Sequence, residues 1–564
     1  MLASGHYLAT LAGLRILQQG GNAADAGVTT AFCLSVLEPH QYGIGGEAIM
    51  LFRSAERNKV FAISGHGVAP RKMNIKWFRE HGMDLIPEHG LLPANVPAAF
   101  DGLVTVLREF GTVSLEQALT PAVELAESGF PMHADLRNSL LDCEPRFREF
   151  WPTSVETFLP GGRVPDIGEV YRQPFWAATF RKVLKAEKDA AHKGRDAALE
   201  AARDYFYKGE IAEKIAEFAQ TEVPWAEGKA RGFLEYDDLA AFHARVEDPV
   251  TTSYRGYDVY KCPSWCQGPV FLQQLNLLEG FDLAAMGHNS ADYIHTVTEA
   301  AKLAFADREA YYGDPLFDDV PMDVLLSKEY ANTRRQRIDP KIASAEFVAG
   351  DVGRGPLPYD ISSAKLGEGN HAGDTTHLDV IDAAGNMFSA TTSGGWLPAS
   401  PAVKGLGFPL PTRCQMFYLD SSRPNALQPG KRPRSTLTPS LALKDGRPYM
   451  AFGTPGGDNQ DQWSLQFFLN VVDFDMNLQA AIDVPYFYTQ HFPCSFYPKK
   501  MFSKRVVLES RIDKAVISEM ERRGHDVLID GPWSQGRVLG IRFGKNSIEG
   551  AASPRTGTPY AAGW

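Results

Sequence analysis

Two groups of residues in this sequence have the types and spacing that acyl-transfer chemistry needs. The hydroxyl pair Thr375-Thr376 begins an alternating, strand-like segment directly after a loop rich in Gly, Pro, Ser and Asp. The glycine pair Gly456-Gly457 lies between a strand-like run and a helical one. A threonine hydroxyl can serve as a nucleophile, and consecutive glycines let backbone N–H groups approach developing negative charge. Together they predict a nucleophile and an oxyanion hole.

Each group alone has a simpler interpretation. Threonines favour strands because their side chains are β-branched, and glycine pairs are common in turns. A phosphate-binding loop is a further alternative for Gly456-Gly457, but the Lys-Ser/Thr that such a loop requires does not follow it. Other parts of the chain therefore have to decide between these interpretations.

The surrounding pattern predicts helices packed on sheets. Apolar spacing and glycine signals predict helices over residues 8–19, 23–36 and 293–311, a mostly helical segment from about 115 to 220, a glycine turn at 43–46 and a buried strand over 48–52. Residues 356–372 read as a loop, and residues 376–392 as a β-hairpin that turns at 382–386. The hydroxyl pair would thus start the first strand of this hairpin.

Composition and charge exclude several classes of function. The chain has 564 residues, 44% of them hydrophobic, and a net charge of −11 without a basic patch, so we expect no nucleic-acid partner. No apolar run reaches the roughly 18 residues of a membrane span. Cys262 and Cys266 lack a second Cys/His pair, which predicts reduced thiols and no metal site. Because no signal peptide is visible, we expect a cytoplasmic protein.

Six motifs, in order along the chain, resemble signatures of the γ-glutamyltransferase family. They are residues 20–26 (GGNAADA), 43–46 (GIGG), 306–311 (ADREAY), 375–377 (TTH), 431–436 (KRPRST) and 454–457 (TPGG). The resemblance implies an α/β (α+β) fold of the N-terminal-nucleophile class, an αββα four-layer sandwich. It also implies self-cleavage between Asp374 and Thr375. The products would be a large portion, 1–374, and a small portion, 375–564, that together form one αββα unit.

The resemblance assigns catalytic roles to several residues. After cleavage, the α-amino group of Thr375 would act as base for its own hydroxyl, since an α-amine titrates at about pH 7.7–8.0. Ser393 falls where the family has a threonine that supports the nucleophile, and Gly456 and Gly457 match the oxyanion pair. Ser435 and Thr436 match a serine pair that holds the substrate carboxylate, although a capped turn after Arg434 is the simpler alternative.

The residues that would bind a γ-glutamyl group depart from the family pattern. His66 stands where the family has a carboxylate-binding arginine, and Arg71 or Lys72 is the nearest substitute. Gly395 replaces an asparagine, and Trp396 adds an apolar surface beside it. The acidic residue that receives the substrate's α-amino group falls at Phe417 or Tyr418. A charged amino-acid head would lose several charge-assisted hydrogen bonds here.

We therefore expect a self-processing amidohydrolase or acyltransferase that needs no cofactor and acts on a small, non-glutamyl acyl amide. The alternatives are a true γ-glutamyltransferase or glutathione hydrolase, and a catalytically inactive binding homologue. The expected partners are the amide substrate and the two fragments of the chain's own precursor. A homodimer of processed units remains open.

Overall fold

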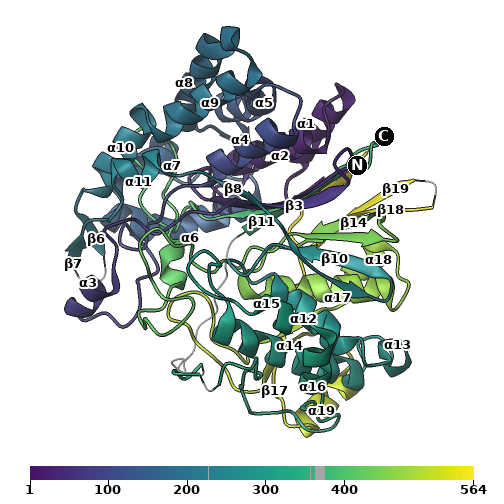
Figure 1. Ribbon diagram of the computed structural model, residues 1–564. Helices are drawn as coiled ribbons and strands as arrows, with labels where there is room; N and C mark the ends of the chain where they lie inside the picture. Colours follow the sequence, from purple (N-terminus) through teal and green to yellow (C-terminus); the bar gives the residue numbers. More distant parts are fainter. Residues whose placement is uncertain (226–227, 356, 362–374, 546, 564) are drawn as a thin grey trace.

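Two stacked β-sheets form the centre of the computed structural model, which describes residues 1–225, 228–355, 357–361, 375–545 and 547–563 (Figure 1). The first sheet has seven antiparallel strands in the order β20-β1-β11-β12-β2-β3-β8. Their bounds are β1 Leu2–Ser4, β2 Glu47–Ser54, β3 Lys59–Gly65, β8 Arg245–Glu247, β11 Thr375–Ile381, β12 Met387–Ser393 and β20 Tyr560–Ala562. The predicted strand and hairpin are confirmed as β2 and β11–β12.

The second sheet has six strands in the order β19-β18-β14-β13-β10-β9. These are β9 Val250–Tyr254, β10 Tyr257–Lys261, β13 Ser440–Lys444, β14 Arg447–Gly453, β18 Leu539–Phe543 and β19 Ile548–Ala552. Alternate side chains of a strand point to opposite faces, and the inward faces of the two sheets share one apolar core. Its members include Leu51, Ile381, Leu441, Ala451 and Ile541.

One outer layer of helices covers the first sheet. Helix α2 packs on β11 and β12, and α4 packs on β2 and β3. The helices of this part of the chain are α1 Tyr7–Gln18, α2 Ala23–Leu37, α3 Ile75–Glu80, α4 Ala99–Phe110, α5 Leu115–Ser128, α6 Ala134–Phe150, α7 Pro152–Phe158, α8 Pro174–Ala190, α9 Arg195–Tyr207, α10 Glu210–Ala219 and α11 Tyr236–Ala240. The predictions of helices over 8–19 and 23–36, and of a mostly helical middle segment, are confirmed.

Another layer of helices covers the second sheet (Figure 1). It is built from α12 Pro269–Leu278, α14 Ala291–Tyr311 and α17 Gln460–Val472, with α13 Leu283–Met286, α15 Met322–Leu325, α16 Lys328–Arg335, α18 Leu478–Asp483 and α19 Lys514–Arg522 around them. Beside it lies a small sheet of β15 Phe487–Thr489, β16 Arg505–Glu509 and β17 Asp526–Asp530. Two short strand pairs remain, β4 Phe130–Pro131 with β5 Val170–Tyr171, and β6 Val223–Trp225 with β7 Gly228–Ala230.

These layers make the αββα four-layer sandwich that the family resemblance implied. Each sheet contains strands from both sides of Thr375: β1 lies between β20 and β11 in the first sheet, and β10 pairs with β13 in the second. The predicted loop 356–372 falls largely outside the described residues. Within the described residues, no helix is long and apolar enough to span a membrane.

Candidate active site

Strand pairing places Thr375, Ser393 and Glu47 in one row across three neighbouring strands. Thr375 is the first residue of β11 and pairs with Ser393 of β12, which pairs in turn with Glu47 of β2. The hydroxyl of Thr375 donates a hydrogen bond to Ser393 Oγ at 3.2 Å. All three side chains are at most 2% exposed. The predicted nucleophile and its supporting hydroxyl are therefore in direct contact.

Arg413 completes this row from a short 3-10 turn, Arg413–Met416. Its Nη2 donates to Ser393 Oγ at 2.5 Å, and its Nε donates to Glu47 Oε2 at 2.8 Å. Asn95 accepts the Arg413 backbone N–H at 2.9 Å and donates to Glu47 Oε1 at 3.2 Å. Sequence reasoning missed Arg413, Glu47 and Asn95, because no local pattern marks them.

A close approach of two glycine segments explains the glycine turn at 43–46. The Gly43 N–H donates to the Gly394 carbonyl at 3.0 Å. A Cβ added to Gly43 would lie 2.1 Å from the Gly395 carbonyl oxygen, and one added to Gly46 would lie 2.3 Å from the Gly394 oxygen. The turn therefore fixes the chain directly after Ser393. Gly395 itself contributes no side chain there, whereas the neighbouring Trp396 ring lies 4.7 Å from the Arg413 guanidinium.

Gly456 and Gly457 lie between the end of β14 and α17, with φ values of 130° and 56°. Such backbone angles are accessible chiefly to glycine. Neither glycine N–H donates a hydrogen bond to another residue in the described parts of the chain. Two unpaired N–H groups near a helix start are able to stabilise an oxyanion, so the predicted role stays a prediction.

A buried ion pair holds this glycine loop. Arg308 pairs with Asp458, which also accepts hydrogen bonds from the Ser495 backbone N–H at 2.8 Å and the Ser495 hydroxyl at 2.6 Å. Arg308 donates as well to Gln267 Oε1 at 2.7 Å. Burial opposes ionisation of Asp458, but the charge of Arg308 outweighs it and keeps the pKa of that carboxyl below its usual value. The 306–311 motif thus contacts the glycine loop through Arg308.

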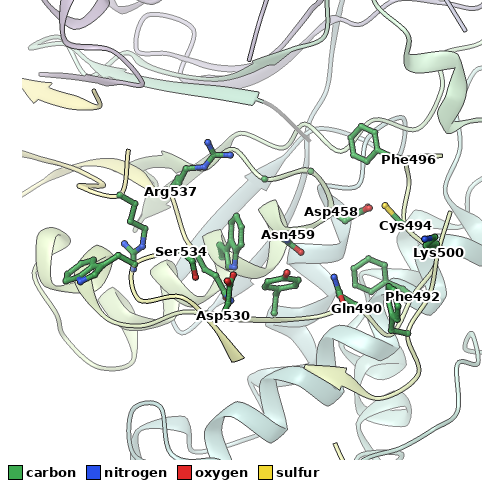
Figure 2. A pocket seen from close by; sticks show the side chains of 18 of the residues that line it. Asp458, Asn459, Gln490, Phe492, Cys494, Phe496, Lys500, Asp530, Ser534 and Arg537 are labelled. Atoms are coloured by element: carbon green, nitrogen blue, oxygen red, sulfur yellow. The ribbon is translucent and has the colours of Figure 1, made fainter. Parts of the chain in front are cut away.

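A cavity of about 420 Å³ opens beside Gly456 and Gly457 (Figure 2). Aromatic side chains supply much of its wall, namely Trp463, Tyr488, Phe492, Phe496, Phe502 and Trp533. Polar groups line it too, among them Lys500, Asp530 and Arg537. Burial raises the pKa of the Glu38 carboxyl to about 7, and the Thr376 hydroxyl and then Arg537 limit that rise. Arg537 therefore both lines the cavity and acts through its charge on Glu38.

The residues predicted to hold a substrate carboxylate are almost completely buried. Ser435 Oγ accepts the Leu437 N–H at 3.2 Å, and Thr436 Oγ1 has no hydrogen-bond partner among the described residues. His66 Nε2 lies 2.5 Å from the Pro433 carbonyl oxygen. Burial lowers the pKa of His66 to about 3, so the ring is neutral. Since a carbonyl only accepts, the hydrogen is on Nε2, and Nδ1 presents a lone pair.

Three predicted residues lie elsewhere or cannot be placed. Arg71 is exposed, and its backbone N–H donates to Asp238 Oδ1 at 3.0 Å. The Tyr418 hydroxyl donates to Glu309 Oε2 at 2.5 Å and lines a separate hollow, while Phe417, the alternative to Tyr418, is buried in an apolar cluster. Asp374, on the other side of the predicted cleavage point, lies outside the described residues.

One group of described residues, His295, Glu299 and His525, has the spacing for a metal ion. Its members already have protein partners. The two imidazoles are 2.9 Å apart, and Glu299 pairs with Lys302 at 2.6 Å. Cys262 and Cys266 are buried free thiols.

Comparison with known proteins agrees with this geometry. The family model described as gamma-glutamyltranspeptidase matches residues 9–563. The "Glutathione hydrolase-like YwrD proenzyme" of Bacillus subtilis is 32% identical over 98% of this chain and 97% of its own length. The "Acylase ACY 1 proenzyme" of a Pseudomonas species is 32% identical over 100% and 93%. The crystal structure of cephalosporin acylase from Bacillus halodurans superposes with a TM-score of 0.83 at 30% identity, covering 100% of this chain and 95% of that one.

Proposed function

The chain belongs to the γ-glutamyltranspeptidase family of amide hydrolases and acyltransferases, and from this premise we propose that it is a self-processing amidohydrolase that forms an acyl-enzyme on Thr375. The observation that carries the proposal is the 3.2 Å hydrogen bond from the Thr375 hydroxyl to Ser393, at the start of β11. The names of the relatives include the word proenzyme, which favours processing.

Processing would begin with attack of Thr375 Oγ1 on the carbonyl carbon of residue 374. The peptide C–N bond breaks, its nitrogen takes the hydroxyl proton, and an ester forms. Water then hydrolyses the ester, which returns the hydroxyl and leaves a carboxylate on residue 374 and a free α-amine on Thr375. Because such an amine is partly neutral near pH 8, it can accept a proton from its own hydroxyl.

Turnover would repeat this chemistry on a substrate amide. The α-amine takes the Thr375 hydroxyl proton as Oγ1 bonds to the substrate carbonyl carbon. The Gly456 and Gly457 N–H groups stabilise the resulting oxyanion. The C–N bond breaks as the leaving amine takes the proton, and water or an acceptor amine then releases the acyl group from Thr375.

The shape of the site favours a compact acyl group and a larger leaving group. Ser393, Arg413, Ser435 and Thr436 are at most 1% exposed, so the acyl side is tightly enclosed. The aromatic cavity of about 420 Å³ adjoins Gly456 and Gly457, where a leaving amine or an acceptor would pass. Transfer to an acceptor amine and hydrolysis by water would use the same cavity.

The two alternatives have less support. A true γ-glutamyltransferase would need a basic residue that binds the substrate carboxylate. The basic residues nearest to His66 in the sequence are Arg71 and Lys72. Arg71 pairs with Asp238, and Lys72 pairs with Glu235. An inactive binding protein would have no need of the Thr375–Ser393 contact.

The test compares wild type with Thr375→Ala on a denaturing gel and by intact-mass measurement. Wild type should give fragments 1–374 and 375–564, and the small fragment should gain acyl mass from an amide panel. Thr375→Ala should remain one chain. Cleavage of the alanine variant at the same bond would show that a contaminating protease acts there.

A further inference from the structure

Two histidines and a glutamate meet where helix α14 passes the C-terminal part of the chain. His295 and Glu299 are four residues apart on α14 and therefore lie on one face of it. Helix α19 packs against α14, and His525 lies between α19 and β17. Two imidazole nitrogens and one carboxylate oxygen of these residues all lie within 4.8 Å of one another. The three residues are at most 6% exposed, so the group is buried.

A single hydrogen lies between the two imidazoles when both are uncharged. His295 Nε2 is 2.7 Å from the Asp339 carbonyl oxygen, and since a carbonyl only accepts, the hydrogen of His295 is on Nε2. Its Nδ1 presents a lone pair, to which His525 Nε2 donates across 2.9 Å. His525 Nδ1 has no hydrogen-bond partner among the described residues, so no contact fixes the tautomer of that ring. The hydrogen can move to Nδ1, and a cation can then take its place between the rings.

The distances suit a tetrahedral zinc ion. Zinc–nitrogen bonds of about 2.0–2.1 Å place two nitrogen ligands roughly 3.3 Å apart. The two imidazoles, now 2.9 Å apart, would have to separate by only about 0.4 Å. Metal-bound imidazoles usually donate their other N–H to a carbonyl or carboxylate, as His295 does to Asp339. Two imidazoles and one carboxylate form a common zinc ligand set, with water in the fourth position.

Glu299 has an oxygen available for a cation. Its Oε1 accepts a hydrogen bond from Lys302 Nζ at 2.6 Å, whereas its Oε2 accepts the Ser344 backbone N–H at a longer 3.4 Å. Lys302 Nζ also donates to the Ser344 carbonyl at 2.9 Å, so it keeps an acceptor when Glu299 turns toward a cation. The ammonium group and the cation carry like charge, so Lys302 should weaken the site without closing it.

We propose that His295, Glu299 and His525 bind one zinc ion, which joins the two portions of the chain. His295 and Glu299 precede Thr375 in the sequence, and His525 follows it. At a rise of 1.5 Å per residue, His295 lies about 20 Å along α14 from Arg308, which holds the glycine loop. The ion would therefore stabilise the joint between the portions without taking part in acyl transfer. This inference goes beyond the proposed function and holds whether or not the chain is cleaved.

The test measures zinc binding by untagged protein that has been stripped with EDTA. Wild type should take up one equivalent of Zn²⁺, and its Tm should rise until the site is filled. Co²⁺ in place of zinc should show the visible absorption of a four-coordinate site. His525→Ala and Glu299→Gln should each weaken zinc binding at least about 100-fold, because loss of an outer partner alone costs roughly 10–100-fold. Lys302→Met should tighten binding, because it removes a like charge beside the ion.

His288→Ala is the matched control. His288 also lies close to α14 and is half-buried, with its Nε2 3.0 Å from Asn470 Oδ1, and its loss should leave zinc binding unchanged. If His525→Ala does not fold, anomalous diffraction from wild-type crystals grown with zinc decides, and a peak between the three side chains is expected. Unchanged affinity in His525→Ala and Glu299→Gln, or no peak at this position, would overturn the inference.

Failure of the proposed function looks different. Removing zinc with EDTA should lower the denaturant concentration at which the fragments separate and leave cleavage before Thr375 intact. A chain that binds zinc at these residues, but is not cleaved and gains no acyl mass, would refute only the acyl-enzyme. A chain that is cleaved and acylated, yet binds no zinc here, would refute only the metal site.

Discussion

Replacing Gly456 with alanine tests the oxyanion loop through a single added methyl group. The Gly456 backbone has a φ of 130°, which L-residues rarely adopt. The new Cβ would lie 2.4 Å from Cζ3 of the Trp463 ring. That indole is 7% exposed within the core of the second sheet and its helices, so the loop has to move and its N–H groups leave their present direction.

Two magnitudes follow for Gly456→Ala. The strained backbone should cost about 1–3 kcal/mol of stability. Loss of one oxyanion donor should lower kcat by roughly 10²–10³-fold, or about 2.7–4 kcal/mol in the transition state. KM should change much less, because the donors act on charge that develops only during reaction.

The assay measures Tm and steady-state turnover of the best substrate in the amide panel for Gly456→Ala and for Gly446→Ala. Gly446 lies in the turn between β13 and β14 with a φ of 71° and no atom near an added Cβ, so it carries a backbone cost of about 1–2 kcal/mol without the clash. Adding Trp463→Leu to Gly456→Ala should restore part of the stability. If both glycine variants lose the same kcat, the oxyanion assignment is wrong.

Three further outcomes are expected. The two fragments of the wild type should co-elute on native size exclusion after cleavage, since both sheets contain strands from each; separation without denaturant would contradict this. Burial raises the pKa of Glu38 to about 7, so its carboxyl stays protonated in the folded chain at pH values where the unfolded chain, with a pKa near 4.5, is ionised. The stability of the fold should therefore fall as pH rises from about 4.5 to 7. Glu38→Gln should lessen this fall, measured as Tm against pH. Glutathione and γ-glutamyl 4-nitroanilide should turn over at least about 10²-fold more slowly than the best substrate in the amide panel. The reason is that His66 and Gly395 stand where the family has side chains that bind the carboxylate and amine of the γ-glutamyl group. Comparable rates would favour a true γ-glutamyltransferase.

Local patterns predicted the elements that carry their own signal. The helices α1, α2 and α14 and the hairpin β11–β12 follow from apolar spacing and glycine or asparagine at their ends. The three-residue strands β1 and β20 carry no such period, although both belong to the first sheet. Their pairing depends on contacts between the two ends of the chain, which single-sequence periodicity does not record.

The candidate site likewise contains residues that the sequence could predict and residues that only the structure brings together. Thr375, Gly456 and Gly457 belong to short motifs, and Ser393 follows from its position after Thr375 in the family pattern, so the sequence could predict them. Arg413 could not be identified, because its role depends on Glu47 and Ser393, which reach it only through strand pairing and a loop. Arg308 belongs to the 306–311 motif, but its ion pair with Asp458 is visible only in the structure.

This division explains how one scaffold can serve different amides. The proposed nucleophile Thr375 and the Ser393 hydroxyl lie on β11 and β12, whose pairing is fixed by a hairpin and by the cores on both faces of the sheet. Arg413 and Gly395 lie instead in the connection from β12 to β13, outside the paired strands. A change of acyl group therefore requires new side chains in that connection, while the chemistry at Thr375 stays as the sheet sets it. Because Arg413 pairs with the buried carboxylate of Glu47, its removal should lower the stability of the fold as well as the activity.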